Sequence, residues 1–346
     1  MPDSMQAAVL YGKEDVRVER VELGQIGPGD LLVRVRAALT CGTDVKVFQR
    51  GYHARMIVPP SPFGHEFAGE VVAAGREVER FRVGDRVVAS NSAPCGNCFY
   101  CKHHQANLCE DLLFNNGAYA EYLCIPRRIV ERNTYHVPDL LTDTDAALME
   151  PLACAVLALN ETGAAKGDTV AVIGPGPIGI MFVKLAKSRG MRVIISGRRQ
   201  AQVDRALDAG ADHGVTTEIP EEAVAHIRAL TDGRGVDVAI EAVGKPELWR
   251  AAAQMLRRGG TVNFFGGCPR GTEVSLPTEL LHYSGLRTIA SFHHTPETNR
   301  AALDHIIAGD VRARDFVGDE RPLAALPDVL AALAKRNGVL KTAIVP

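Results

Sequence analysis

The sequence TVAVIGPGPIG occupies residues 169–179 and joins an apolar, β-branched run to three glycines, Gly174, Gly176 and Gly179, spaced as G-x-G-x-x-G. An apolar, helix-like segment, Ile178–Arg189, follows directly. Between a strand and a helix this pattern is typical of a dinucleotide fingerprint. The first glycine permits a tight turn, the second lets the backbone approach a pyrophosphate, and the third lets helix pack on strand. We therefore predict a nucleotide site here. A purely structural glycine turn is the alternative.

The chain from residue 169 onward alternates between strand and helix patterns, which predicts a parallel sheet with helices on both faces, an α/β fold. The expected strands are Thr169–Ile173, Arg192–Ile195, Val236–Glu241, Thr261–Phe265 and Arg287–Ser291. The expected helices are Ile178–Arg189, Ala201–Ala209, Glu221–Leu230 and Glu247–Leu256. A glycine stands where several of these helices should end.

Residues 1–90 are instead rich in strand patterns. Leu31–Ala37 alternates with a period near two, and Glu70–Gly75 and Asp85–Ala89 are further candidate strands. Residues 91–115 form a cysteine-rich insertion with neither a helical nor a strand period. The sequence thus predicts a β-rich first part and a separate nucleotide-binding part.

Composition excludes several classes of protein. The 346 residues are 46% hydrophobic and 23% charged, with a net charge of −2, so a nucleic acid is not a favoured partner. No apolar run approaches the roughly 20 residues of a membrane span, and the first residues lack the pattern of a signal peptide. We expect a cytoplasmic protein that is not associated with membranes and has a small-molecule partner.

Four of the eight cysteines, Cys95, Cys98, Cys101 and Cys109, lie within 15 residues. Four thiolates with this spacing predict a closed, tetrahedral structural zinc site. The loop has little apolar content, so metal bonds would replace a core. A redox pair or two disulfides are the alternatives, and the nearby His103 and His104 are possible competing ligands.

A second set of metal-ligating types is dispersed along the chain: Cys41, His65, Glu66 and Glu150. Glu150 lies in an apolar segment, where a carboxylate is costly unless it is paired or metal-bound. A thiolate, an imidazole and carboxylates form a plausible catalytic zinc set with one position left for water or substrate. Cys154, one helical turn after Glu150, is the alternative for the last ligand.

These motifs together resemble the zinc-containing medium-chain dehydrogenases, in particular the sorbitol and threonine dehydrogenase branch. The matching segments are Cys41–Asp44, Pro62–Glu66, Val83–Val87, the four-cysteine loop, Glu150–Leu152 and Gly174–Gly179. The resemblance implies a GroES-like catalytic domain over 1–155 with a structural-zinc lobe at 91–115. It further implies a Rossmann NAD(P)-binding domain over 156–290 and a return to the catalytic domain over 291–346.

The resemblance also assigns roles to single residues. Cys41 and His65 would be ligands of the catalytic zinc, Glu66 a ligand or an exchanging neighbour, and Glu150 the ligand that is cysteine in simple alcohol dehydrogenases. Thr43 would pass the substrate proton outward. Asp44 would hold the ring of His65. Lys46 stands where simple alcohol dehydrogenases often have a relay histidine, so the outer part of the proton path differs here.

Cofactor choice is expected to depend on the end of the second Rossmann strand. An NAD-preferring enzyme usually has an acidic residue there, whereas this chain has Gly197 followed by Arg198 and Arg199. Either arginine could pair with a 2′-phosphate, which predicts that NADP is favoured over NAD. The alternative is that both arginines are solvated. The full set of predicted cofactor-binding residues is Gly174, Gly176, Pro177, Ile178, Gly179, Gly197, Arg198, Arg199 and Lys341.

We therefore expect an enzyme with two zinc ions per subunit that transfers hydride between a secondary alcohol, of polyol, sugar or amino-alcohol type, and NAD(P). A reductase of simpler carbonyls, a zinc-free quinone or enoyl reductase, and a non-enzymatic zinc- and nucleotide-binding protein are the alternatives. A homodimer or homotetramer is expected by resemblance. Polar residues that would line the substrate pocket are Lys46, Tyr52, His53, Asn91, Asn115, Asn116, His293 and His294.

Overall fold

The computed structural model describes residues 3–52, 56–335 and 338–346, so His53 lies outside the described residues. The chain divides into two units, one made of residues 1–153 and 294–346 and the other of residues 154–293. Each unit has its own sheet and is described by itself. Among the described residues, the longest apolar helices are too short to cross a membrane.

The second unit is built on a six-stranded parallel sheet with the order β13-β12-β11-β14-β15-β16. The strands are β11 (Thr169–Ile173), β12 (Arg192–Gly197), β13 (His213–Thr216), β14 (Val236–Glu241), β15 (Leu256–Phe264) and β16 (Arg287–Ile289). The helices between them are α6 (Pro177–Ser188), α7 (Gln200–Asp208), α8 (Pro220–Ala229), α9 (Pro246–Gln254) and α10 (Thr278–Tyr283). This is a Rossmann sheet, as the sequence predicts.

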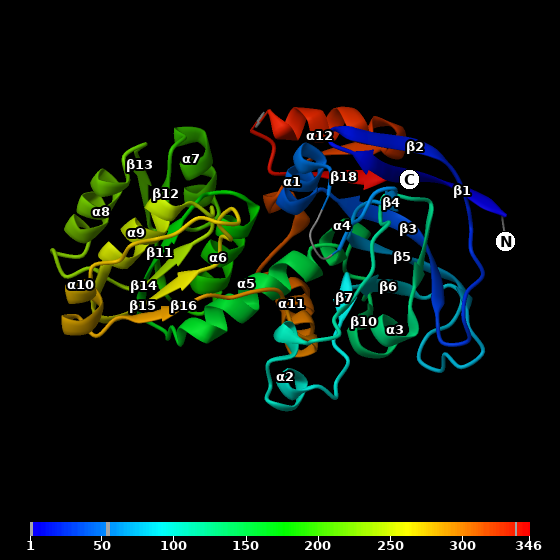
Figure 1. The fold of residues 1–346 in the computed structure, drawn as a ribbon, viewed down its shortest axis with the longest axis horizontal. Helices are drawn as coiled ribbons and strands as arrows, with labels where there is room; N and C mark the ends of the chain where they lie inside the picture. The colour runs from blue at the N-terminus through cyan, green and yellow to red at the C-terminus, as the bar shows by residue number, and fades with distance from the viewer. Residues whose placement is uncertain (1–2, 53–55, 336–337) are drawn as a thin grey trace. The chain divides into compact units, whose positions relative to one another are not determined.

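The strand order reverses direction at β11, and this determines where the helices lie. Right-handed crossovers place α6 and α7 on one face and α8 and α9 on the other. Accordingly, α6 contacts α7, and α8 contacts α9 (Figure 1). The central strand β11 is buried along its whole length, which explains its continuous apolar sequence. The glycine turn follows this strand at the reversal point, where α/β sheets bind their ligands.

The first unit is β-rich. Its larger sheet has the order β10-β6-β5-β3-β18-β17, with β9 also paired to β3, and a smaller sheet has the order β2-β1-β4. The strands are β1 (Ser4–Gly12), β2 (Asp15–Glu22), β3 (Leu31–Leu39), β4 (Ser61–Pro62), β5 (Glu66–Ala74), β6 (Arg86–Ala89), β9 (Tyr122–Ile125), β10 (Thr134–His136), β17 (Val317–Pro322) and β18 (Lys341–Val345). Three helices matter for the site: α1 (Gly42–Arg50), α5 (Met149–Thr162), which continues into the second unit, and α11 (Pro296–Ala308).

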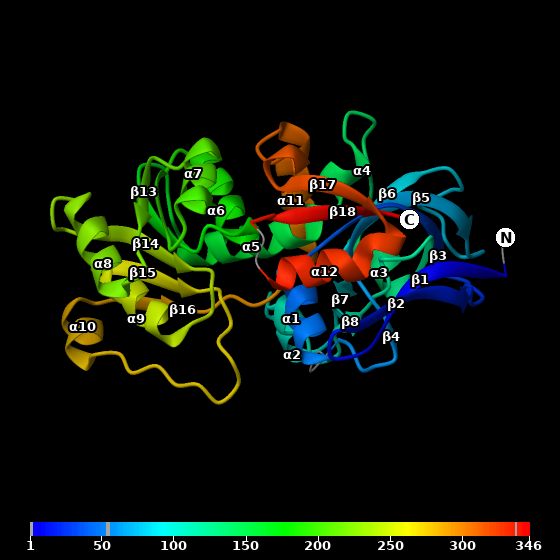
Figure 2. The ribbon, with the colours of Figure 1, turned by 90° about the horizontal axis from the view of Figure 1, so that it is seen from above.

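Two segments far apart in the chain complete the first unit. Strand β18 pairs antiparallel with β3, so that Ala343 lies opposite Leu39 and Ile344 opposite Ala38. Helix α12 (Leu326–Ala334) packs on α1, and both views show the two helices side by side (Figures 1 and 2). The β-rich core is therefore closed by the C-terminal segment.

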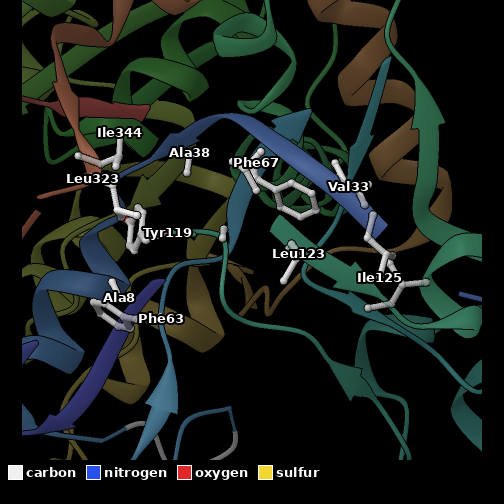
Figure 3. Close-up of a cluster of buried hydrophobic side chains, with 14 of the residues drawn as sticks. Ala8, Val33, Ala38, Phe63, Phe67, Tyr119, Leu123, Ile125, Leu323 and Ile344 are labelled. Carbon is white, nitrogen blue, oxygen red and sulfur yellow. The ribbon is translucent and has the colours of Figure 1, made fainter. Parts of the chain in front are cut away.

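The core of this unit combines inward-facing residues of the strands with buried residues of helices and loops. Phe63 and Tyr119 are fully buried, and their rings meet edge to face with centroids 5.8 Å apart. Leu323 and Ile344, from the C-terminal segment, lie in the same cluster as Ala8 (Figure 3). Removing this much apolar surface from water is the main stabilising contribution to the unit.

The cysteine-rich insertion has only short regular elements. They are β7 (Ser92–Ala93), α2 (Phe99–Lys102) and β8 (Leu113–Phe114), with a 3₁₀ turn at Ala106–Leu108. Its side chains contribute little to the apolar cluster of this unit, where only Ala93 and Leu113 appear. The cysteines must therefore supply the cross-links that a core would otherwise provide.

Candidate metal and cofactor sites

The start of α1 holds three of the predicted site residues, Cys41, Thr43 and Asp44. Cys41 is the N-cap of this helix, and its Sγ accepts the Thr43 N–H at 3.4 Å. Asp44, one turn later, returns a carboxylate oxygen to the Cys41 N–H at 3.0 Å, which completes a capping box. The same Asp44 oxygen accepts the hydroxyl of Tyr119 at 2.6 Å. Helix capping therefore fixes both the thiol and the carboxylate before any ligand binds.

Three dispersed residues converge into one donor group. The ligand atoms of Cys41, His65 and Glu66 all lie within 4.8 Å of one another. His65 directly precedes β5, and Glu66 is the first residue of that strand. The strand therefore brings both side chains to the N-terminus of α1, where Cys41 lies. A soft thiolate, an imidazole and a carboxylate are ligands that zinc accepts together.

The second nitrogen of His65 is oriented by Asp44. Its Nδ1 lies 3.0 Å from Asp44 Oδ1, the carboxylate arrangement usual behind a metal-bound imidazole. Burial lowers the pKa of His65, but Asp44 and Cys41 more than offset this and raise it well above its ordinary value. A divalent cation would take the place of that proton. Glu66 Oε1 is buried without a hydrogen-bond partner, so the residues present fit a metal ion.

Lys341 provides a countercharge that the sequence did not indicate. Its Nζ donates to a carboxylate oxygen of Glu66 and, at 3.0 Å, to the carbonyl of Thr40. Burial alone would lower the pKa of Lys341, but Glu66 and Cys41 outweigh this effect and raise the pKa above its ordinary value. The ammonium therefore stays charged. Our prediction for Lys341 is cofactor binding, and the structure places this side chain behind the donor group in the first unit.

Glu150 lies in the first turn of α5 and is buried, outside the three-residue donor group. Burial raises its pKa to about 7, and Glu66 contributes to this while His65 and Lys341 oppose it. The charges of His65 and Glu66 therefore bear on the ionisation of the Glu150 carboxylate. Cys154 is on the same helix, one turn later.

The four cysteines of the insertion lie together with all thiols free. Cys95 and Cys101 have their sulfur atoms 4.0 Å apart, and Cys98 and Cys109 have theirs 3.9 Å apart. A tetrahedral zinc with bonds of about 2.3 Å requires sulfur separations of about 3.8 Å. Backbone N–H groups lower the pKa of Cys98 to about 6, which favours the thiolate. The group fits a structural zinc, and His103 is engaged instead with the Phe99 carbonyl at 2.7 Å.

The glycine turn has the shape that a pyrophosphate needs. Gly174 has a φ of +106°, and a Cβ on Gly179 would lie 1.9 Å from the Gly174 carbonyl oxygen. A Cβ on Gly176 would meet open space, because this residue is the N-cap of α6 and faces outward. The first N–H groups of α6, among them that of Ile178, are therefore available to a phosphate, and the turn fits a dinucleotide.

Gly197 ends β12 beside this turn. A Cβ here would lie 2.5 Å from Cγ of Pro175, so packing alone favours glycine at this position. Arg198 is exposed, and Arg199 is the N-cap of α7.

Several residues of the first site were not predicted from the sequence. The Tyr119 hydroxyl donates a hydrogen bond to the Asp44 carboxylate. Burial and Asp44 raise the pKa of Tyr119 well above its ordinary value. Ser90 and Asn299 form a buried hydrogen bond of 2.7 Å beside His294. The available signal was weak: Asn299 is a polar residue on the inward face of an amphipathic helix.

A thiolate–imidazole–carboxylate group in a β-rich unit and a glycine turn in a Rossmann unit define a class of zinc- and dinucleotide-dependent oxidoreductases. Comparison with known proteins agrees. Residues 27–139 match the alcohol dehydrogenase GroES-like domain, and residues 177–308 match the zinc-binding dehydrogenase domain. The chain belongs to the zinc-containing medium-chain dehydrogenase family and is an NAD(P)-dependent alcohol dehydrogenase.

Individual relatives cover most or all of the chain. The sorbitol dehydrogenase of Bacillus subtilis (strain 168) is 30% identical over 100% of this chain and 98% of its own length. The L-threonine 3-dehydrogenase of Chelativorans sp. (strain BNC1) is 35% identical over 83% and 84%. The crystal structure of a zinc-binding dehydrogenase from Sinorhizobium meliloti 1021 bound to NADP has a TM-score of 0.89 at 31% identity, covering 100% of both chains. The predicted fold class, a GroES-like domain plus a Rossmann domain, is confirmed.

Proposed function

We propose that this enzyme oxidises a secondary alcohol of polyol, sugar or amino-alcohol type, with zinc at the Cys41–His65–Glu66 group and with NADP favoured over NAD. The observation that carries the proposal is the convergence of three metal-ligating atoms within 4.8 Å of one another. The named activities of the sorbitol and threonine dehydrogenases support the substrate class, because both act on a hydroxyl beside a second polar group.

Zinc, when bound, acts as a Lewis acid that lowers the pKa of a hydroxyl group presented to it. The chain itself supplies the rest. Thr43, in the first turn of α1, would relay the proton that the substrate hydroxyl loses, and its own hydroxyl proton would pass outward to solvent as it takes up that of the substrate. Asp44 keeps the His65 ring in the orientation that leaves its other nitrogen for the metal. The Rossmann unit places the nicotinamide that receives the hydride.

Two carboxylates compete for the same ion. With Cys41, Glu66 and Glu150 all bound, ligand charges of −3 would face +2, which makes a weak Lewis acid. We propose that one glutamate leaves the metal during turnover. Lys341 stabilises Glu66 when it is detached, because the ammonium is already in contact with its carboxylate. A ternary complex with substrate and both carboxylates still bound to zinc would contradict this.

The preference for NADP is proposed on the second Rossmann strand. Gly197 presents no carboxylate to repel a 2′-phosphate, and Arg198 and Arg199 follow it at the start of α7. A similar protein at 31% identity is described as bound to NADP. We also propose that the protein is cytoplasmic, because its four closely spaced cysteines are free thiols. A homodimer or homotetramer is proposed on the family resemblance.

The test is an oxidation screen of C4–C7 polyols, sugars, sugar phosphates and amino alcohols with both cofactors, together with zinc analysis. We expect two zinc ions per chain and the highest kcat/KM for a vicinal polyol or amino alcohol with NADP. A Cys41→Ala variant should keep one zinc and lose turnover. Two results would overturn the proposal: turnover that survives complete zinc removal, or reduction of simple carbonyls with no polyol oxidation.

A further inference from the structure

A buried chain of hydrogen bonds leads toward Glu150. Ser90 and Asn91 follow β6, and His294 and Asn299 come from the start of α11. The Ser90 hydroxyl donates to Asn299 Oδ1 at 2.7 Å, the Asn299 amide faces His294 Nδ1 at 3.2 Å, and His294 Nε2 lies 3.2 Å from Asn91 Oδ1. All four side chains are buried. Polar side chains are costly to bury unless they are hydrogen-bonded, and here the four side chains bond to one another. The network is therefore a specific part of the structure.

The network determines which nitrogen of His294 carries the proton. Because the Asn299 oxygen accepts the Ser90 hydroxyl, its amide nitrogen is the atom that faces Nδ1 of His294. That nitrogen donates, so Nδ1 is the acceptor and the hydrogen is on Nε2. Nε2–H thus donates to the oxygen of Asn91, and Oε1 of Glu150 lies 3.8 Å from the same nitrogen.

The position of His294 is itself fixed by the backbone. The next residue, Thr295, is the N-cap of α11, and its Oγ1 accepts the N–H of Thr298 at 3.3 Å. The imidazole therefore extends from a pinned helix start. It cannot turn away without breaking the bonds to Asn299 and Asn91.

We infer that His294 is a positioning residue for Glu150: its Nε2–H, oriented by Asn299, directs the carboxylate toward the metal-binding group. The inference rests on the proposed zinc site. A carboxylate that ligates a metal is usually held by a hydrogen-bond donor on its other oxygen, and losing such a donor costs about 10- to 100-fold in metal affinity. At 3.8 Å the two atoms are not hydrogen-bonded, and the inference requires the Glu150 carboxylate to approach Nε2 when it binds the ion.

The test measures zinc affinity by competition with a chelator, with the lobe zinc of the same molecule as an internal reference. His294→Leu removes the donor, and His294→Gln keeps an N–H near the Nε2 position. His305→Gln is the matched control, since His305 lies on the same helix and bonds instead with Asp310 at 2.7 Å. We expect 10- to 100-fold weaker binding of the catalytic zinc in the leucine variant only, with rescue by glutamine.

A double-mutant cycle separates positioning from packing. If His294 acts through Glu150, the affinity for the catalytic zinc in Glu150→Ala/His294→Leu equals that in Glu150→Ala alone. Additive losses, or an unchanged affinity in His294→Leu, overturn the inference. The proposed function fails separately: it fails if the unmodified enzyme holds only the lobe zinc. The absorption of the Co²⁺-loaded enzyme gives a second reading, because a displaced carboxylate shifts its visible band.

Discussion

Lys341 is a buried cation opposite the buried Glu66 carboxylate, in contact with it and with the Thr40 carbonyl. Two charges removed from water are tolerated only when each satisfies the other. This ion pair could not be predicted from the sequence, because 275 residues separate Glu66 from Lys341. The contact is a consequence of β18 lying beside β3.

Removing the ammonium should therefore weaken the whole unit. Lys341→Met leaves the Glu66 charge without its partner, and we expect the free energy of unfolding to fall by about 3–5 kcal/mol. Urea denaturation followed by circular dichroism measures it. Lys341→Met/Glu66→Gln should recover a part of that loss. A single variant as stable as the parent protein would show that the pair has no net role.

Thr43 offers a test of proton transfer at the residue scale. Thr43→Val keeps the size of the side chain and removes the hydroxyl, and we expect kcat to fall at least about 100-fold. Thr43→Ser should retain most of the activity. Both variants should hold the same zinc as the parent enzyme. Equal kcat in valine and serine variants would exclude the hydroxyl from the proton path.

At the scale of elements, the sequence pattern predicted those strands whose residues are buried in the sheet. Strands β11 and β14 begin and end at the predicted residues, because each has a run of buried apolar residues, 170–173 in β11 and 238–240 in β14, between glycine or charged turns. Strand β13 was missed, since its four residues, HGVT, are largely polar and bury only Val215. Its pairing with β12 forms it, and no local pattern carries that information.

The candidate sites divide in the same way. The four cysteines of the insertion are local, so spacing alone predicted their role. Cys41, His65 and Glu66 are brought together by α1 and β5; their residue types suggested a zinc set, and the family resemblance assigned each residue its role. The contacts of Tyr119 and His294 depend on side-chain packing across several elements, which periodicity cannot predict.

The end of β12 gives a prediction about cofactor choice. A charged hydrogen bond contributes roughly 1.5–3 kcal/mol, so Arg198→Ala/Arg199→Ala should raise the KM for NADP about 10- to 100-fold and leave that for NAD nearly unchanged. Steady-state kinetics with both cofactors decide it. A parent enzyme that clearly prefers NAD would contradict the assignment. Gly197→Asp is not the matching swap, because its Cβ would clash with Pro175.

At the scale of the whole molecule, the first unit is made of two segments separated by the entire Rossmann unit. Its insertion has a four-cysteine group that could hold a metal in place of a core, and its sheet includes the late strand β18. We therefore expect the stability of this unit to depend both on zinc and on a segment distant in sequence.

Loss of the lobe metal should be visible as loss of stability. Cys98→Ser removes one thiolate, and we expect one of two zinc ions to be lost and Tm to fall by at least about 5 °C. Elemental analysis and calorimetry measure both. A Cys124→Ser variant is the control, because that thiol lies outside the cluster and burial raises its pKa to about 11. Full zinc content in Cys98→Ser would rule out the four-thiolate site.

The pairing of β18 with β3 has a consequence for biogenesis. Cys41, His65 and Glu66 leave the ribosome long before Lys341 does, since the Rossmann unit is synthesised in between. During that interval the nascent chain has the metal-ligating side chains of Cys41, His65 and Glu66 but not the Lys341 ammonium that contacts Glu66 in the folded protein. We therefore expect selective binding of the metal ion only after β18 has paired with β3 and Lys341 has reached Glu66.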